Sequence, residues 1–349
     1  MPALLFEKKT ASGMAALPFL LLLLAAPSAF AAQSFSDLPP TDPAFEAAEF
    51  LKANNIISGY PDGTFRPANK VNRAEALKII VAPLVNAEEL KTVTATPFSD
   101  IASDAWFLPY VEVARQNGII DGPPAKTAFN GANTVIRAEF FKMLEMANKT
   151  DPQASFSDIS LPLSQDVGSA QDWFYPYMRY AIASSMTMVN TTDGLLNPGK
   201  ELTRGEITIF LYRFLMYRSG RRTQALLSEA ENEIILILNM LQNDDLPQAS
   251  AASARAMLAT RGALAMKPDE PVVKGSVKIS EAFNLLVQAY GSGKSGELDQ
   301  AIALSGEAWN KSAKALEFSP NLKTIVEQVQ VLAKNMADSA RAAQAAQPK

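Results

Sequence analysis

The triplet Arg-x-Glu occurs three times in this chain, beginning at Arg73, Arg137 and Arg204. Each triplet stands where the surrounding residues predict the start of a helix. A guanidinium group offers a planar fork of N–H donors that matches a carboxylate, and the positive end of a helix dipole adds attraction for an anion. The three arginines could therefore hold an acidic group of a ligand. An intramolecular Arg–Glu ion pair that holds the adjacent loop explains any single copy equally well, and the residues leave both interpretations open.

The chain of 349 residues contains no cysteine and no histidine. This excludes disulfides, zinc sites built from Cys and His, cysteine nucleophiles and every mechanism that uses imidazole as a base. Catalysis by carboxylates, lysine or tyrosine is not excluded. The net charge of −4 gives no general attraction to nucleic acid or to an anionic membrane surface. We expect no catalytic residue, no metal, no cofactor and no nucleic-acid partner.

The first 31 residues have the pattern of a cleavable secretion signal. Lys8 and Lys9 form a positive segment, Ala15–Ala26 is apolar, and Ala29–Ala31 fits an Ala-x-Ala cleavage site. The apolar stretch is too short to span an ordinary bilayer comfortably, and no later segment has the length and apolar character of a membrane span. We therefore expect residues 1–31 to be removed on export, and no membrane span afterwards.

The tripeptide Phe-Ser-Asp also recurs, at residues 35–37, 98–100 and 156–158. Together with the Arg-x-Glu triplets, it divides the following chain into repeated units of similar plan. The predicted repeats cover residues 35–90, 98–150 and 156–219.

Each unit is predicted to run from a first helix through a short apolar pair and a turn to a second helix. Asn72 can cap the second helix while Glu75 reaches back to it, and Thr203 and Glu206 can do the same. Ile136 stands at the cap position of the middle unit and has no side-chain acceptor. The aspartates of the Phe-Ser-Asp tripeptides are expected to be caps or turn residues: Asp37, Asp100 and Asp158.

These motifs resemble, in their order, the S-layer homology family over about residues 35–217. The shared features are the Phe-x-Asp start, a Trp-x-x-x-Tyr/Ala first helix, the Gly-Ile-Ile-x-Gly turn, the Asp-Gly-x-Phe-x-Pro loop and the Thr-Arg-Ala-Glu helix opening. The resemblance implies a mainly α fold, in which three helix–loop–helix units form a pseudo-trimer around a central three-helix bundle. It also implies a secreted protein held non-covalently on the cell wall. Its ligand would be a wall polysaccharide, often pyruvylated, or a peptidoglycan-associated glycan.

The resemblance further implies which residues hold the glycan. A ketal-linked pyruvate would present a carboxylate to the arginines, and aromatic faces suit the C–H surfaces of sugars. For Trp106 and Trp173, the helical pattern favours core packing instead. The turn of the third unit departs most from the family pattern, which favours ligand sites in the first two units. The implied ligand residues are Arg73, Arg137, Arg204, Trp106, Trp173, Gly59, Asp62 and Gly122.

Beyond Tyr217 the composition changes, and residues 221–349 are rich in alanine and leucine with few aromatic residues. This region is predicted to be an α-helical bundle that serves assembly, self-association or recruitment. The alternative is an anchored cell-wall enzyme with a catalytic C-terminal region, which would need paired carboxylates in a cleft rich in aromatic residues. The predicted helices span about 221–242, 248–265, 276–290, 297–317 and 321–343.

Overall fold

The computed structural model describes residues 33–190 and 192–347, so the predicted secretion signal lies outside the described residues. The described chain is mainly helical, as the sequence predicts, with only isolated β-bridges between loops. Among the described residues, no helix is both long and apolar enough to cross a membrane. The α-helices are α1 Phe45–Ala53, α2 Arg73–Val81, α3 Ala87–Thr92, α4 Leu108–Gln116, α5 Arg137–Ala147, α6 Tyr175–Ala183, α7 Arg204–Arg218, α8 Thr223–Gln242, α9 Leu246–Met266, α10 Pro271–Lys294, α11 Leu298–Phe318 and α12 Lys323–Ala345, with short 3-10 turns at Ala82–Leu84 and Pro320–Leu322.

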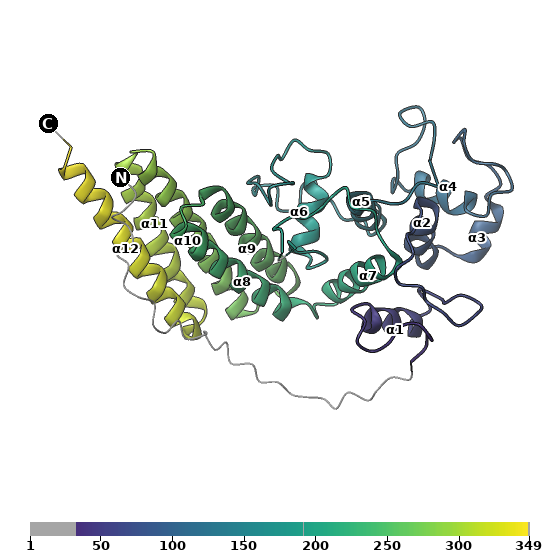
Figure 1. The fold of residues 1–349 in the computed structure, drawn as a ribbon, viewed down its shortest axis with the longest axis horizontal. Coiled ribbons are helices and arrows are strands. Elements are labelled where there is room, and N and C mark those ends of the chain that lie inside the picture. The colour runs from purple at the N-terminus through teal and green to yellow at the C-terminus, as the bar shows by residue number, and fades with distance from the viewer. Residues whose placement is uncertain (1–32, 191, 348–349) are drawn as a thin grey trace.

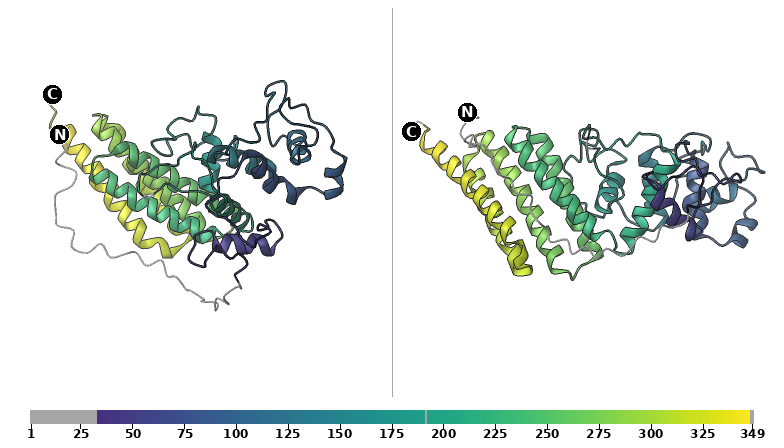
Figure 2. Two further views of the ribbon diagram at one scale, coloured as in Figure 1. Left: turned by 45° about the vertical axis from the view of Figure 1, so that its right-hand side comes forward. Right: turned by 60° about the horizontal axis from the view of Figure 1, so that its bottom comes forward.

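The molecule is elongated, with two unlike halves (Figure 1). Helices α1 to α7 and their long loops form one half, and helices α8 to α12 lie side by side in the other. The further views show the same row of long helices, with α6 next to it (Figure 2). Each unit of the first half contributes one short helix, α1, α4 or α6, and one second helix, α2, α5 or α7. The first unit also carries α3, which lies between α2 and α4 in the sequence.

A closed ring of backbone hydrogen bonds joins the three units at their centre. Val71 N donates to Leu202 O at 3.1 Å, Leu202 N donates to Val135 O at 3.0 Å, and Val135 N donates to Val71 O at 3.0 Å. All three side chains are buried. This cyclic arrangement matches the pseudo-trimer that the family resemblance implies. The second helices start beside the ring, and Phe141 of α5 packs edge-on against Phe210 of α7 with ring centroids 5.1 Å apart.

Each second helix is capped by the loop of the next unit. Arg73 N donates to Asn133 O at 2.8 Å, and Ala74 N donates to Gly131 O at 3.1 Å. The N–H groups that an α-helix leaves unpaired at its start are therefore already bonded to carbonyls, which makes them unavailable to a ligand. An anionic ligand could therefore be bound at these helix starts by the arginine side chains and not by the backbone N–H groups. The corresponding bonds of the other helices run from Arg137 to Lys200, Ala138 to Pro198, Arg204 to Asn69 and Gly205 to Pro67.

The capping predictions are confirmed where a suitable side chain is present. Asn72 accepts from Glu75 N at 2.9 Å while the Glu75 carboxylate accepts from Asn72 N at 3.0 Å. Thr203 and Glu206 form the same reciprocal pair. At Ile136, only the backbone N–H donates, to the Glu139 carboxylate at 3.4 Å.

An aspartate clamps the loop of each unit. The two oxygens of Asp37 accept from Phe65 N at 2.6 Å and Arg66 N at 2.8 Å. Burial opposes ionisation of Asp37, but the backbone donors outweigh it and hold the pKa of its carboxyl below the usual value. Asp100 makes the matching pair of bonds, to Phe129 N and Asn130 N.

In the third unit, Asp166 is the clamp, whereas Asp158 lies in a turn, as predicted, without clamping the loop. Asp166 accepts from Leu196 N at 3.0 Å and Asn197 N at 2.6 Å. Asp158 instead forms an ion pair with Arg261 of α9. The third unit therefore begins later than its Phe-Ser-Asp tripeptide indicates. The segment between the tripeptide and Asp166 contacts the helical half, through Asp158 with Arg261 and through Leu163 O with Arg255.

The hydrophobic core runs without a break from the third unit into the helical half. All nine residues of α6 are buried, and α6 packs against α9. Counting from the helix starts, Ile182 of α6 stands where α4 has Arg115. The outer face of α6 is therefore apolar at a position that is polar in α4. The sequence boundary near residue 219 falls at the α7–α8 connection, yet it does not separate two cores. The core contributed from beyond this boundary comprises Leu226, Leu227, Ala230, Ala254, Met257, Leu258, Ala259, Ala263 and Val273.

One buried ion pair of the helical half also reaches across this joint, through a bond from its arginine to the third unit. The Arg255 guanidinium donates to both oxygens of Glu233, at 2.8 and 2.7 Å, and to Leu163 O at 2.6 Å. Only 5% of the Arg255 side chain is exposed. Removing one partner of such a pair would leave a buried charge without compensation. These contacts, together with the continuous core, join the third unit and the helical half into one body.

The helical half is an array in which each helix packs on its neighbours in the sequence. Helix α10 runs through Gly291 and Gly293 to Lys294, so the predicted break there comes later than the sequence suggests. Small residues of α11 let it lie close to α10 along most of its length. The buried residues of that seam are Ala301, Ser305, Ala308, Ser312 and Ala315.

One buried carboxyl group in the repeat half has no partner among the described residues. Glu145 of α5 is fully buried, and neither of its carboxylate oxygens forms a hydrogen bond. Burial raises the pKa of Glu145 well above its usual value. A raised folded-state pKa means that the folded protein loses stability as the pH rises from the unfolded pKa, about 4.3, through the folded one.

Glu145→Gln is therefore expected to stabilise the protein at pH 8, by roughly 1–3 kcal/mol, and to have much less effect at pH 4. The measurement is urea unfolding at both pH values. Glu112 is the matched control, since it is buried but accepts from Arg115, Gln116 and Thr96. The Arg115 bonds, helped by the others, lower the pKa of Glu112, so its contribution is present above the unfolded pKa and lost on acidification. Glu112→Gln should destabilise at pH 8. A Glu145→Gln variant that is less stable than the parent at pH 8 would contradict this prediction.

Candidate functional site

Three inter-unit sites, called grooves I to III, are equivalent by the repeat, and one of them, groove II, is a described cavity lined by residues of all three units. An arginine at the start of one unit's second helix faces the loop and second helix of the next unit, and the first helix of the remaining unit forms the third side. Groove I contains Arg204 and the loop of the first unit. Groove II contains Arg73 and the loop of the second unit, and groove III contains Arg137 and the loop of the third. The arginine thus never faces the loop of its own repeat.

Groove II is an open cavity of about 570 Å³. Arg73 comes from the first unit, Glu139 and Lys142 from the second, and Trp173 from the third. Arg73 lies 3.3 Å from the Glu139 carboxylate and stacks over Phe129, with its guanidinium carbon 5.3 Å from the ring centroid. The cavity is lined by Arg73, Phe98, Ile119, Ile120, Asp121, Lys126, Ala128, Phe129, Asn130, Asn133, Thr134, Ile136, Glu139, Lys142, Met143 and Trp173.

The lysine of groove II is paired with its own loop. Lys142 Nζ lies 2.7 Å from Asp121 Oδ2 and 5.9 Å from the ring centroid of Tyr177. Lys142, helped by Lys126 and Arg73, lowers the pKa of the Asp121 carboxyl against the effect of burial. Asp121 is therefore ionised near neutral pH and neutralises Lys142.

The corresponding cations of groove I, Arg204 and Lys78, form no ion pair among the described residues. Arg204 donates to Ser58 O at 2.5 Å and lies over the rings of Tyr60 and Phe65, 5.3 and 4.9 Å from their centroids. Lys78 lies over Trp106, 5.4 Å from its ring centroid. In the described part of the chain, no carboxylate oxygen comes within 4.0 Å of either cation. Burial lowers the pKa of Arg204, with Tyr60 and Glu75 opposing it, yet arginine stays charged at any physiological pH.

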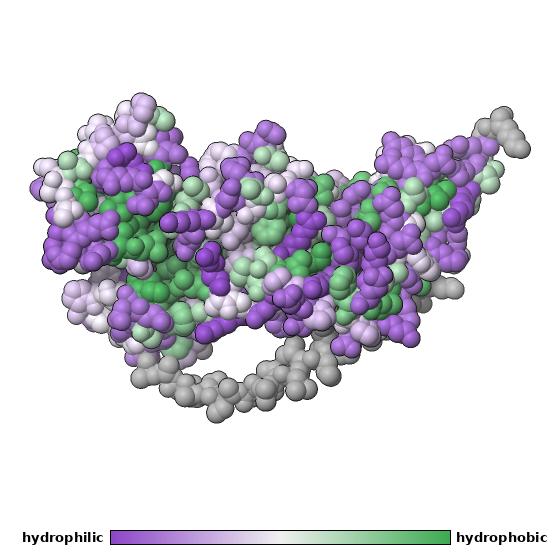
Figure 3. All heavy atoms as spheres, turned by 180° about the vertical axis from the view of Figure 1, so that it is seen from behind, coloured by the Kyte–Doolittle hydropathy of each residue, from purple (hydrophilic) through white to green (hydrophobic). Residues whose placement is uncertain are grey.

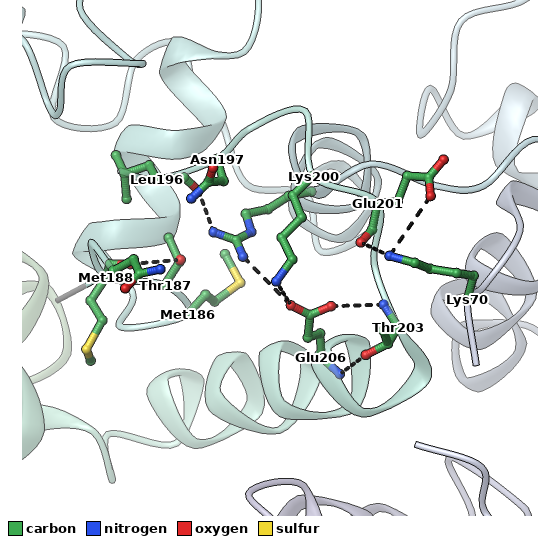
Figure 4. Close-up of polar contacts among 12 residues, drawn as sticks. Lys70, Met186, Thr187, Met188, Leu196, Asn197, Lys200, Glu201, Thr203 and Glu206 are labelled. Atoms are coloured by element: carbon green, nitrogen blue, oxygen red, sulfur yellow. Dashed lines mark hydrogen bonds and ion pairs between the residues drawn. The ribbon is translucent and has the colours of Figure 1, made fainter. Parts of the chain in front are cut away.

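Groove III is closed by its own side chains. Lys200 Nζ contacts the Glu206 carboxylate at 2.7 Å, and Thr203 N donates to the same group (Figure 4). Arg137 donates to Leu196 O, lies 3.9 Å from Glu206, and leaves only 11% of its side chain exposed. The ligand role implied for Arg137 stays a prediction, since its side chain is largely buried against Leu196 O and Glu206.

Groove III also lacks the lysine and the tryptophan of the other two grooves. Counting from the helix starts, Ile209 of α7 corresponds to Lys78 of α2 and Lys142 of α5. Pro43 stands two residues before α1, as the tryptophans stand two residues before α4 and α6. Both substitutions remove groups that could contact a polar ligand. The sequence prediction that the third unit departs most from the others is in line with this.

The two tryptophans are exposed, so the prediction of core packing is wrong for them. Trp106 is 53% exposed and Trp173 is 52% exposed. Each precedes its helix and packs edge-on against the following phenylalanine, with centroids 5.4 and 5.7 Å apart. Seen from behind, the repeat half has apolar surface gathered between polar rims (Figure 3). An exposed ring fixed by its neighbour is a ready contact surface for a ligand. Trp106 also borders a second, smaller cavity of about 360 Å³ beside Asp100.

The turn residues have structural tasks that the sequence did not separate from binding. A Cβ at Gly59 would lie 2.8 Å from the Phe35 ring, and one at Gly122 would lie 2.7 Å from Arg115 Cδ. Asp62 accepts from Thr64 and from Arg66, which lowers its pKa to about 2. These glycines allow close packing, and Asp62 closes its own turn.

Sequence reasoning missed Lys78 and Lys142. The signal was present, because a lysine stands five residues after the arginine in the first two units and an isoleucine stands there in the third. Its meaning was hidden because the helical pattern alone does not say which exposed side chains share a groove.

Comparison with known proteins matches part of the chain to a family. The family model described as "S-layer homology domain" matches residues 34–77 and 97–141. The chain is 28% identical to the surface-layer 125 kDa protein of Lysinibacillus sphaericus over 48% of this chain and 14% of that protein. It is 32% identical to cell surface glycoprotein 1 of Acetivibrio thermocellus over 46% of this chain and 7% of that protein.

A cellulosome-anchoring protein of Acetivibrio thermocellus is 27% identical over 52% of this chain and 39% of that protein. The chain thus spans less than half the length of each of these relatives. Their names, together with the family match, support a surface protein associated with the cell wall. The chain thus carries, in its first half, two stretches that match the S-layer homology domain, residues 34–77 and 97–141.

Proposed function

We propose that this protein is anchored to the cell wall by polysaccharide bound in grooves I and II, and that groove III has a structural role. The observation that carries the proposal is the shared constellation of grooves I and II. Each combines an arginine stacked on an aromatic ring, a lysine, and an exposed tryptophan from another unit. Aromatic faces and cations that converge on one open groove suit an acidic or hydroxyl-rich sugar. Two grooves on one chain would also add avidity toward a polymer.

We propose further that the helical half, α8 to α12, is not catalytic and serves assembly or recruitment of other proteins at the surface. The continuous core between α6 and α9 supports this proposal, because it makes the array a rigid extension of the third unit. An anchored enzyme remains the competing function. Release of soluble fragments from purified peptidoglycan by the full chain would favour the enzyme.

The anchoring proposal is tested by sedimentation of the full chain with wall sacculi, before and after removal of the non-peptidoglycan polymers. The full chain is used because the third unit shares its core with the helical half. Binding that is lost on polymer removal would identify a secondary wall polymer as the ligand. Binding that persists would identify peptidoglycan-associated glycan. No sedimentation with native sacculi would refute anchoring by these grooves.

Arg204→Lys is expected to weaken sacculus binding about tenfold while leaving the fold intact, because lysine keeps the charge but loses the planar fork. This corresponds to the roughly 1.5–3 kcal/mol of a charge-assisted hydrogen bond. Arg137→Lys is the matched control, since Arg137 donates to Leu196 O and forms an ion pair with Glu206 in groove III. It should lower the melting temperature and leave binding at the parent level. A loss of binding in Arg137→Lys equal to that in Arg204→Lys would contradict the division between the grooves.

A further inference from the structure

One loop position differs in chemical type in each of the three grooves. Asn55, Gly118 and Ser185 each have a positive φ at the end of the first helix, which aligns the units residue by residue. Three positions later, the first unit has Ser58 and the second has Asp121. The third unit has Met188 at this place.

This position decides whether the groove lysine is free. In groove II the side chain at the position is a carboxylate, which lies 2.7 Å from Lys142 Nζ. In groove I it is the hydroxyl of Ser58, and Lys78 keeps no carboxylate partner in the described part of the chain while it lies over Trp106. Freed and neutralised lysines differ in what they can bind, because an ammonium already paired with a carboxylate gains little from a second anion.

The arginines follow the same division. Arg73 of groove II has Glu139 at 3.3 Å. Arg204 of groove I is bonded to a backbone carbonyl, and Glu75, which favours its charged form, forms no ion pair with it within 4.0 Å among the described residues. The free ammonium of groove I is that of Lys78, over the exposed Trp106.

The loops show the reverse pattern. Arg66 in the loop of groove I is paired with Asp62 at 2.7 Å. Lys126 occupies the rim of groove II without an ion-pair partner among the described residues. The two grooves thus differ in where a free cation stands: it is Lys78, over Trp106, in groove I and the loop residue Lys126 in groove II.

We propose that the two grooves select different sugars: groove II takes an uncharged saccharide on Trp173, with Asp121 as the residue that excludes the acid. Groove I, where Ser58 stands in place of Asp121 and Lys78 lies unpaired over Trp106, takes an acidic saccharide. The inference rests on the proposed glycan binding and goes beyond it by assigning ligand charge to each groove. Asp121 acts by neutralising Lys142 and repelling a ligand carboxylate, so it is a specificity-determining residue.

The exposed tryptophans report on the grooves separately. The experiment titrates ¹⁵N-labelled full chain with two disaccharides, glucuronic acid linked to N-acetylglucosamine and the neutral counterpart with glucose. The indole N–H signals of Trp106 and Trp173 are followed after assignment with Trp→Phe variants. The Trp106 signal should respond to the acidic sugar at about tenfold lower concentration than to the neutral one. The Trp173 signal should show the reverse preference and respond to the neutral sugar at lower concentration than to the acidic one.

The decisive variants exchange the residue types of the two grooves at Ser58 and Asp121. Asp121→Ser should give the Trp173 signal an acid preference of about tenfold, and Ser58→Asp should remove the preference at Trp106. Met188→Ser is the matched control and should change neither signal, because Ile209 stands where the other grooves have lysine. Lys126→Ala should leave the Trp173 response without acid preference.

The proposal is overturned if the parent Trp173 signal prefers the acid as strongly as Trp106 does, or if the exchanges leave both preferences unchanged. It is also overturned if neither signal responds to either disaccharide while the chain still sediments with sacculi. Failure of the anchoring function is a separate result, because it would appear as absence of sedimentation with native sacculi.

Discussion

A variant in which alanine replaces both Trp106 and Trp173 is expected to lose affinity for wall sacculi by at least about a hundredfold. Both rings are about half exposed, at 53% and 52%, and each stands beside the lysine of its groove. Truncating a central aromatic residue of an interface costs about 2 kcal/mol or more, which is roughly thirtyfold. Losing both removes the two contacts and the avidity between them. The measurement is a sedimentation isotherm of the full chain with sacculi.

Trp309 is the matched control for this variant. It is the third tryptophan of the chain, is 41% exposed, and lies on α11 in the helical half. Trp309→Ala should bind sacculi like the parent. The double variant should keep a melting temperature near that of the parent, since neither ring fills a core. Wild-type binding by a folded double variant would remove the tryptophans from the site.

Gly262→Val is expected to lower the melting temperature by roughly 6–12 °C, corresponding to about 3 kcal/mol or more. Helix α9 passes the end of α6 so closely that a Cβ at Gly262 would lie 1.7 Å from Ala183 O and 2.7 Å from Ala183 C. Both are backbone atoms, so the two helices must separate. Separation would also strain the nearby Arg255 contacts to Glu233 and Leu163. The measurement is differential scanning calorimetry of the full chain.

Gly306→Ala also adds a side chain to a helical glycine, but it should stabilise the protein instead of destabilising it. Gly306 lies within α11, and nothing stands within 4 Å of a Cβ placed there. Alanine is a better helix former than glycine, so this variant should gain about 0.5–1 kcal/mol. Because the joint couples the two halves, Gly262→Val should also split the calorimetric transition into two. A single transition at the parent temperature would show that α6 and α9 do not depend on this close approach.

The sequence by itself determined the features that local interactions define. Repetition predicted the three units, and the Arg-x-Glu triplets predicted the starts of α2, α5 and α7 to the residue. Asn72 and Thr203 were predicted as reciprocal caps because the partners of a capping box are three residues apart. The aspartate clamps of the first two units were predicted as turn or cap residues, and their bonds span only about 30 residues.

Interactions across the units had no local signature, and only the tertiary structure decided them. Arg204 contacts Ser58 across 146 residues, because the closed ring of backbone bonds places each arginine against the loop of the next unit. Helical periodicity reports which residues share a face and is silent on which face meets which neighbour. This is why Trp106 was predicted as core and is exposed.

The third unit shows the same limit most clearly. Its Phe-Ser-Asp tripeptide matches the others in letters, yet Asp166 forms the clamp and Asp158 binds Arg261 of α9. The apolar outer face of α6, with Ile182 in place of a polar residue, was visible in the sequence. The reason for this apolar face became clear only from the structure, in which α9 covers it. Burial is a property of pairs of surfaces, so the sequence determined the units and the packing against α9 decided how far the core extends.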